Sequence, residues 1–252
     1  MPIAFDRCTF AYRRRRYVID RLNLTFSTGR TVLLGPNGAG KSTLLALAAS
    51  ALRPGAGTVR HESTRTTAKR AQLAAYRRNV AWMPQELSVV PGLTAREQVA
   101  YAGWLKGLSR REAWERALGA LRQVELGNRA DEKVSSLSGG QQRRVGVAQA
   151  LVHEARVLLL DEPTAGMDPR QRTVFHEALA GLPPSVHVIL STHDTADLEA
   201  VYDQVVVVDE GRVAFQGPVR AFLGHADPAA VPGRKADSAY HTLTGGNRTW
   251  DS

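Results

Sequence analysis

Apolar residues gather in short runs along the chain, and stretches with helical spacing separate these runs. Four runs stand out, at Thr31–Leu34, Val157–Leu160, Val186–Leu190 and Val205–Val208. Continuous apolar runs of this length are typical of strands buried on both faces, and their alternation with helical segments is typical of a parallel sheet. The pattern therefore predicts an α/β fold in which helices cover both faces of a mostly parallel sheet.

Two stretches depart from this alternation. The first thirty or so residues predict short strands joined by turns, with Leu22–Phe26 as a strand of alternating type. Later in the chain, two capping boxes mark helix starts at Thr94–Glu97 and Ser109–Glu112, and the spacing that follows is helical. We therefore expect an N-terminal β region and a helical insertion over about residues 87–150.

The last segment, residues 225–252, combines Pro, Gly, Ser, Thr and Asp with little periodicity. Composition of this kind buries too little apolar surface to offset the entropy cost of ordering the chain. We therefore expect one main domain over residues 1–224 and a loosely ordered C-terminal tail over 225–252.

Composition narrows the class of protein. The 252 residues are 43% hydrophobic, which is ample for a core, and the single cysteine, Cys8, excludes a disulfide within the chain. No run approaches the ~18 apolar residues that cross a bilayer, so we expect any membrane role to come through a partner. The net charge is +9, but the arginines are dispersed and lack interleaved aromatics, so no specific nucleic-acid partner is expected.

A glycine-rich loop directly follows the first apolar run and precedes a helical segment, and it fits the pattern Gly-x4-Gly-Lys-Ser. Glycines let the backbone amides approach phosphates, and the helix start adds the positive end of its dipole. Lys41 is expected to reach the β- and γ-phosphates, and the Ser42 hydroxyl to bind Mg²⁺. The residues expected to hold the nucleotide are Gly35, Pro36, Asn37, Gly38, Ala39, Gly40, Lys41, Ser42 and Thr43.

Two acidic residues, Asp161 and Glu162, end the second apolar run. Carboxylates at the carboxyl end of a parallel strand lie where α/β sheets bind ligands. We expect Asp161 to hold Mg²⁺, directly or through water, and Glu162 to orient and deprotonate an attacking water.

Four shorter features are weak in isolation. Gln85 follows a proline in a loop and can be an ordinary turn residue, and Asp168 can be a helix N-cap. Leu137–Gln141 precedes a helical run and can be a second anion site or a plain N-cap. His193 follows an apolar strand and can contact a γ-phosphate or be structural.

In their order along the chain, these features resemble the ATPase domain of ABC transporters, whose signature is Leu-Ser-Gly-Gly-Gln. The resemblance covers about residues 3–223. It implies a P-loop NTPase core with a mostly parallel sheet, an N-terminal antiparallel β subdomain and an inserted α-helical signature subdomain. It also implies an enzyme that hydrolyses ATP with Mg²⁺.

The resemblance assigns roles to the weaker features. The signature loop of one subunit would complete the ATP site of a second subunit, so that two ATP molecules lie in a head-to-tail dimer. His193 would be the switch histidine, and Gln85 would bind Mg²⁺ beside Ser42 and Asp161. Tyr12 would stack on adenine, although it can equally be ordinary packing. The residues expected to act across the dimer are Ser138, Gly139, Gly140, Gln141 and Asp168.

Residues 85–108 resemble the subgroup that pairs with ABC-2 type membrane permeases, which commonly export drugs, lipids or polysaccharides. This resemblance implies a separate permease partner that holds the chain at the cytoplasmic face of the cell membrane. It also implies that the helical insertion carries the groove for that permease.

Other machines use the same kind of ATPase domain. A chromosome-maintenance or repair ATPase would need a long coiled coil before the signature, and sustained heptads are absent here. A translation factor usually carries two such domains in one chain, and an iron–sulfur assembly subunit typically departs from this signature. A non-catalytic regulatory or nucleic-acid-binding module would usually have lost Glu162, His193 or the signature. We therefore favour the transporter subunit.

Overall fold

The structure of the chain, a computed structural model, describes residues 2–13, 16–195, 198, 201–231 and 233–245. Its centre is a six-stranded sheet with the strand order β10-β9-β3-β8-β7-β6. Neighbouring strands are parallel except for β9 and β10. The strands are β3 (Arg30–Leu34), β6 (Val80–Met83), β7 (Val157–Asp161), β8 (His187–Thr192), β9 (Gln204–Asp209) and β10 (Arg212–Pro218).

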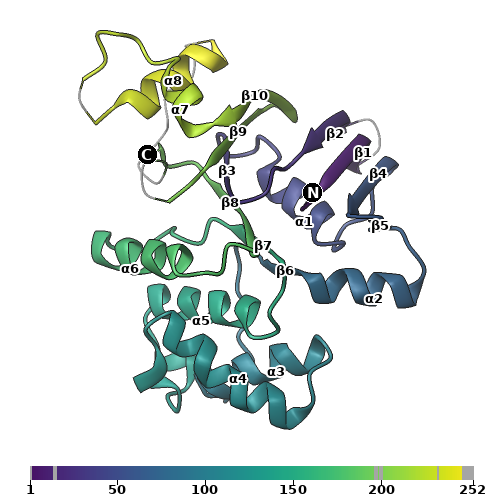
Figure 1. Cartoon of the computed structure of the whole chain (residues 1–252), viewed down its shortest axis with the longest axis vertical. Coiled ribbons are helices and arrows are strands. Elements are labelled where there is room, and N and C mark those ends of the chain that lie inside the picture. The colour runs from purple at the N-terminus through teal and green to yellow at the C-terminus, as the bar shows by residue number, and fades with distance from the viewer. Residues whose placement is uncertain (1, 14–15, 196–197, 199–200, 232, 246–252) are drawn as a thin grey trace.

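A second, antiparallel sheet with the order β2-β1-β4-β5 stands beside the central sheet (Figure 1). Its strands are β1 (Ala4–Arg13), β2 (Arg16–Thr25), β4 (Ala56–His61) and β5 (Thr64–Arg65). Helix α1 (Lys41–Ala48) shares one hydrophobic cluster with both sheets, because Leu44, Leu45 and Leu47 are fully buried there. The N-terminal β region and the mostly parallel sheet are therefore confirmed.

Helices cover the other face of the central sheet. Successive side chains of a strand point to opposite faces, so Val32 and Leu34 join the cluster under these helices whereas Leu33 joins the cluster with α1. These helices are α3 (Ala95–Leu105), α4 (Arg110–Gln123), α5 (Gly139–Leu151) and α6 (Pro169–Ala180). Helix α2 (Arg70–Asn79) packs instead on the side of α1, where its buried Tyr76 joins the same cluster as Leu33. Helices α3, α4 and α5 lie together at one end of the molecule, as the helical insertion predicts (Figure 1).

Both predicted capping boxes form. The side chain of Thr94 accepts the Glu97 backbone N–H at 3.2 Å, and the side chain of Ser109 accepts the Glu112 backbone N–H at 3.2 Å. In each case the glutamate reaches back to the cap residue's own N–H. These caps satisfy backbone donors that a helix start leaves without partners.

The prediction of a loosely ordered tail is wrong for Lys235–Thr244. After α7 (Val219–Leu223), residues Lys235–Thr244 form helix α8, which lies against α7 and β10. Ala236, Ala239 and Tyr240 are buried in the main core. Their spacing places them on one face of a helix, and this face buries enough apolar surface to order the segment. Residues 246–252 of the predicted tail lie outside the described residues.

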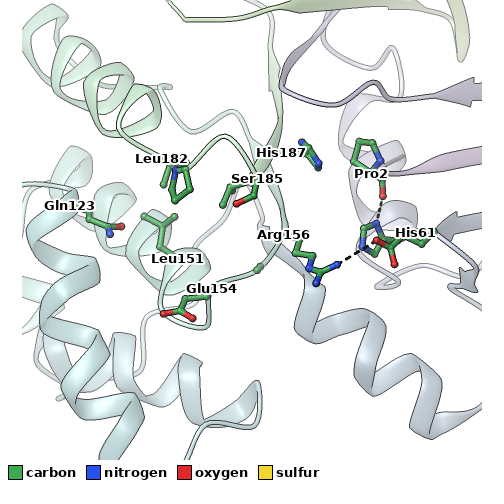
Figure 2. A pocket seen from close by; sticks show the side chains of 13 residues that line it. Pro2, His61, Gln123, Leu151, Glu154, Arg156, Leu182, Ser185 and His187 are labelled. Carbon is green, nitrogen blue, oxygen red and sulfur yellow. Dashed lines mark hydrogen bonds and ion pairs between the residues drawn. The ribbon is translucent and has the colours of Figure 1, made fainter.

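No helix within the described ranges is both long enough and apolar enough to span a membrane. A cleft of about 740 Å³ opens at the edge of the central sheet where the parallel strands begin. Figure 2 shows its lining, which includes Arg156 and, at the start of β8, His187. Arg156 pairs with Glu62. None of the predicted site residues lines this cleft.

Candidate nucleotide site

The glycine-rich loop lies between β3 and α1 at the opposite edge of the sheet, where the parallel strands end. At Gly35 a Cβ atom would stand 2.2 Å from the carbonyl oxygen of Val208, so only glycine lets the loop pass β9. Gly40 is the N-cap of α1 and has φ 102°, a left-handed conformation that favours glycine. No described side chain caps this helix start. The first amides of α1 therefore keep their capacity to bind an anion.

Lys41 begins α1, and its side chain is folded back over the loop. The Nζ atom donates to the carbonyl oxygens of Gly35 at 2.7 Å and Pro36 at 3.2 Å, and it stands 3.3 Å from the Glu162 carboxylate. Only 5% of the side chain is exposed. Burial lowers the pKa of Lys41, and the nearby charge of Glu162 opposes this shift. The ammonium is thus held at the centre of the loop.

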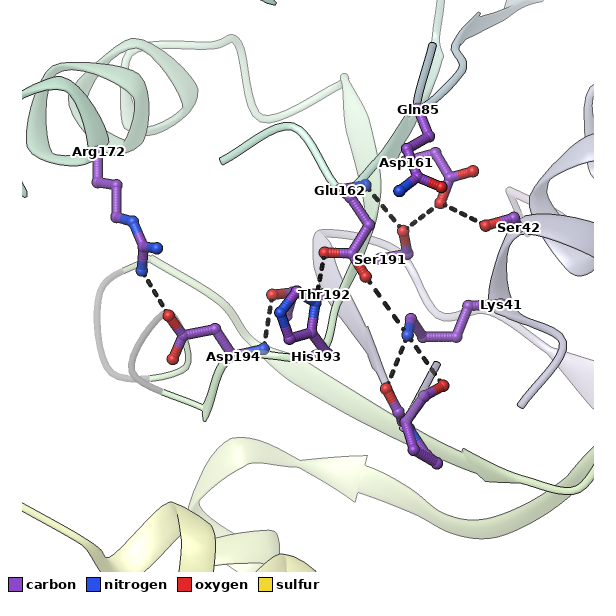
Figure 3. Close-up of polar contacts among 12 residues, drawn as sticks. Lys41, Ser42, Gln85, Asp161, Glu162, Arg172, Ser191, Thr192, His193 and Asp194 are labelled. Carbon is purple, nitrogen blue, oxygen red and sulfur yellow. Dashed lines mark hydrogen bonds and ion pairs between the residues drawn. The ribbon is translucent and has the colours of Figure 1, made fainter. Parts of the chain in front are cut away.

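Asp161 ends β7 and faces the start of α1. Its Oδ1 accepts hydrogen bonds from the hydroxyls of Ser42 at 3.1 Å and Ser191 at 2.5 Å. Ser191 comes from the neighbouring strand β8, in register with Asp161. The predicted metal residues Ser42 and Asp161 are therefore brought together, and Ser191 orients the carboxylate between them (Figure 3).

Glu162 turns out of the sheet directly after Asp161. Its backbone has φ 47°, and its N–H donates to Ser191 Oγ at 3.0 Å. Its carbonyl oxygen accepts from Arg143 of α5 at 3.0 Å. Left-handed backbone is uncommon outside glycine and costs of order 1 kcal/mol, and here hydrogen bonds on both sides hold it. This conformation directs the carboxylate toward Lys41 and His193 (Figure 3).

His193 follows the end of β8, and its Nδ1 donates to Glu162 Oε2 at 2.9 Å. The two groups differ in exposure, because 45% of the His193 side chain is exposed against 7% for Glu162. Lys41 and His193 therefore hold opposite oxygens of one carboxylate. The structure brings all three predicted residues together.

A cleft of about 460 Å³ opens above the loop, and Glu162 and Gln85 contribute to its lining. Gln85 reaches it from the loop after β6 and is exposed. Tyr12 stands at the rim with 64% of its surface exposed, and its hydroxyl lies 3.3 Å from Thr43 Oγ1. Its ring also packs edge-on against Phe10, with 4.9 Å between centroids. An exposed ring at this position is available for stacking on a ligand.

The signature residues and Asp168 do not line this cleft. Ser138 is the N-cap of α5, where its Oγ accepts the Gln141 N–H at 3.3 Å and the Gln141 side chain accepts the Ser138 N–H at 2.9 Å. Ser138 and Gly139 are exposed, whereas Gly140 is buried. Asp168 is the N-cap of α6, and its Oδ1 accepts the Gln171 N–H at 2.8 Å. Ser138 and Asp168 therefore both act as helix caps, the alternative role that the sequence allows for each.

Sequence reasoning missed two contributors to the site, Ser191 and Arg143. Ser191 had a detectable signal, because it is a polar residue near the end of an apolar strand, one strand from Asp161. Arg143 had none, because its contact with the Glu162 carbonyl depends on how α5 packs beside β7.

Comparisons with known proteins identify the family of this chain. Residues 19–165 match the protein family described as ABC transporter. The chain is 36% identical over 188 residues to the uncharacterized ABC transporter ATP-binding protein YxlF of Bacillus subtilis, covering 75% of this chain and 61% of that protein. It is 35% identical to the Nod factor export ATP-binding protein I of Burkholderia lata, covering 82% of this chain and 68% of that protein. It is 32% identical to the linearmycin resistance ATP-binding protein LnrL of Bacillus subtilis, covering 81% of this chain and 65% of that protein.

The chain thus spans between 61% and 68% of the length of these three curated relatives.

Among solved structures, it resembles the dimeric bacterial ABC transporter cassette MJ0796, with a TM-score of 0.78 and 27% identity over 86% of this chain and 99% of that one. The same cassette bound to ADP and phosphate matches with a TM-score of 0.75 and 26% identity, over 86% of this chain and 99% of that one. The predicted fold is confirmed, and the chain belongs to the ABC transporter family of ATP-binding domains.

Proposed function

We propose that this chain is the ATP-hydrolysing subunit of a membrane transporter, and that it drives export through a separate permease. The observation that carries the proposal is the Glu162 carboxylate, held between Lys41 and His193 above the phosphate-binding loop. A carboxylate there is placed to orient and deprotonate a water molecule that attacks a γ-phosphate, while Lys41 neutralises the phosphate charge.

The donor set beside the loop fits Mg²⁺. Ser42 Oγ and Asp161 Oδ1 lie 3.1 Å apart, and both are oxygen atoms of the kind that Mg²⁺ prefers. Among the described residues no cluster of three or more His, Cys, Asp or Glu side chains is suited to a metal ion. This sparse set suits Mg²⁺, which is bound through one or two carboxylates, substrate phosphates and water. Ser42, Asp161 and Gln85 would hold the ion, which when bound neutralises charge on the phosphates.

A second copy of the chain would complete the site. Ser138 and Gly139 are exposed at the start of α5 and do not line their own chain's cleft. The Ser138 Oγ uses a lone pair to cap α5, so its O–H proton stays available to donate to a phosphate oxygen. A head-to-tail dimer would place this helix start against the ATP held by the partner's loop. The related cassette MJ0796 is dimeric in its solved structure, and this supports the arrangement.

An aromatic surface on α3 and α4 supports a protein partner. Tyr101, Trp104 and Leu105 of α3 and Trp114 of α4 are each at least 42% exposed, and Tyr101, Trp104 and Trp114 line one groove. Arg96 stacks over Trp114, with its guanidinium 4.0 Å from the ring centroid. Exposed aromatic clusters of this kind mark interaction sites. We assign this surface to an ABC-2 type permease, which would hold the chain at the cytoplasmic face of the membrane. Export follows from the relatives named for Nod factor export and linearmycin resistance.

Hydrolysis is tested with the purified chain, ATP and Mg²⁺, comparing wild type with Glu162→Gln. We expect the variant to bind ATP as tightly as wild type, to hydrolyse it about 10³-fold more slowly because the general base is lost, and to accumulate as a dimer. Phosphate release, ATP binding and mass by light scattering give the three readouts. Equal turnover by the two proteins would remove Glu162 from the mechanism.

The permease is tested by purifying the tagged chain from detergent-solubilised membranes of its host and identifying what accompanies it. We expect a multi-span membrane protein in stoichiometric amount with wild type and much less of it with Trp104→Glu. Glu115→Gln, on the exposed side of α4, is the matched control and should retain the partner. Recovery of soluble or ribosomal proteins alone would contradict transport but leave ATP hydrolysis standing.

A further inference from the structure

Two side-chain contacts anchor the short loop that carries His193 immediately after that histidine. Asp194 pairs with Arg172 of α6, with 2.5 Å between Oδ2 and Nη1. Thr195 Oγ1 donates a hydrogen bond to Asp237 Oδ1, which belongs to the first turn of α8. Helix α8 thus contacts this loop at Thr195, two residues after His193, which itself contacts the Glu162 carboxylate.

We propose that Thr195 and Asp237 are positioning residues for ATP hydrolysis, and that α8 acts as a brace for the loop bearing His193. This inference rests on the proposed function, because it concerns the rate at which that site works. The proposal gives a role to α8, which begins more than forty residues after His193 in the sequence.

Helix α8 is a firm support for such a contact. Ala239 is fully buried and Tyr240 is 4% exposed, so the helix is fixed to the core by its apolar face. A second hydrogen bond joins Ser238 Oγ to the backbone N–H of Asp227, in the segment before α8. Neither contact involves Asp237. The packing of α8 is therefore independent of the Thr195–Asp237 bond, and removing that bond leaves the helix in place.

The bond is partly shielded from water. Thr195 is only 8% exposed, whereas Asp237 is half-buried. Asp237 lies at the positive end of the α8 dipole, which favours its negative charge. A loop held at Thr195 has less freedom at His193, because only Asp194 intervenes.

Position matters here because His193 contacts Glu162 through a hydrogen bond of 2.9 Å, and 45% of the His193 side chain is exposed. Packing holds a side chain that is nearly half exposed less firmly than a buried one, so the backbone that carries it contributes more to its position. Misplacement of a catalytic group by about 1 Å can cost up to about 10²-fold in rate. Loss of the brace should therefore lower turnover without removing any group that contacts ATP.

The test measures steady-state ATP hydrolysis by the full chain in four variants. We expect Asp237→Ala and Thr195→Val each to lower kcat about 3- to 10-fold with KM for ATP within about twofold. The double variant should be no slower than either single variant, because both remove the same bond. Asp237→Asn should keep near wild-type kcat, since its amide oxygen still accepts the Thr195 hydroxyl.

Ser238→Ala is the matched control, because it removes a hydrogen bond of α8 that does not touch the loop; its kcat should match wild type. Two results would overturn the brace: unchanged kcat in Asp237→Ala and Thr195→Val, or an Asp237→Asn kcat as low as that of Asp237→Ala. Either result with an active wild type leaves the proposed function intact. An inactive wild type would instead count against the proposed function.

Discussion

Two helices of this domain have glycines at their N-terminal ends, and their first turns are built differently. The N-cap of α1 is Gly40, whose left-handed backbone takes the place of a side-chain cap. The N-cap of α5 is Ser138, and a complete capping box satisfies part of the first turn. The first start is packed into the chain, with Lys41 only 5% exposed, whereas the second presents exposed Ser138 and Gly139.

The difference shows which parts of a phosphate site one chain supplies by itself. At the start of α1, Lys41 contacts Glu162, and Ser42 donates a hydrogen bond to Asp161. The start of α5 has no such neighbours in the cleft, and its capping box keeps the helix start ordered until something binds there. We therefore interpret α1 as the half of the site that binds ATP in one chain, and α5 as the half that acts on a partner's ATP.

Along α5, the largest effect is expected from a bulky charge at its exposed start. A Cβ at Gly139 meets no atom within 4 Å, so Gly139→Arg leaves the single chain intact. It would add a side chain where the partner's γ-phosphate must fit, so the signature of the variant chain could not complete a partner's site. We expect ATP binding within about twofold of wild type and hydrolysis lowered about 10²-fold, as for loss of a preorganised donor. Gly140→Ala is not a clean alternative, because its Cβ would lie 2.0 Å from Gln171 Oε1.

His153, which follows the C-terminal end of α5, is expected to make stability depend on pH. Burial, and then the charge of Lys106, lower the pKa of His153 to about 4. Between pH 6.5 and 4 the unfolded chain takes up a proton at this residue while the folded chain does not, so stability falls as pH falls. The loss should reach up to about 3 kcal/mol near pH 4. Urea unfolding at several pH values should show this slope in wild type and a shallower slope in His153→Leu. Parallel curves for the two proteins would contradict the burial of a neutral imidazole.

The smallest effect is expected at the α5 cap. Ser138→Ala removes the acceptor for the Gln141 N–H and should lower the free energy of unfolding by about 1 kcal/mol. It also removes the hydroxyl donor offered to a partner's ATP, so hydrolysis should fall several-fold. Ser138→Thr keeps both functions and should restore stability. A variant that lost stability without any loss of hydrolysis would reduce Ser138 to a helix cap.

How far the sequence predicts this molecule depends on how local each contact is. Each of the first two apolar runs is followed closely by two adjacent site residues: Lys41 and Ser42 after the first run, and Asp161 and Glu162 after the second. The sequence therefore predicted that these residues lie at the same edge of the sheet. The role of Ser191 depends on the register between β7 and β8, which no local pattern specifies. Helix α8 was missed because its buried face is made largely of alanines, which give a weak hydrophobic signal even at helical spacing.

The division of labour between α1 and α5 is tested most directly by mixing two inactive variants. Lys41→Ala has an impaired loop and an intact signature, and Gly139→Arg has the reverse. In a head-to-tail dimer of one chain of each, one site combines the intact loop with the intact signature and the other combines both defects. The account predicts that each variant alone is inactive and that an equal mixture recovers up to about a quarter of wild-type hydrolysis, since about half of the dimers are mixed and each has one good site. A mixture as inactive as its components, with mixed dimers demonstrated by differently tagged chains, would contradict a site shared between two chains.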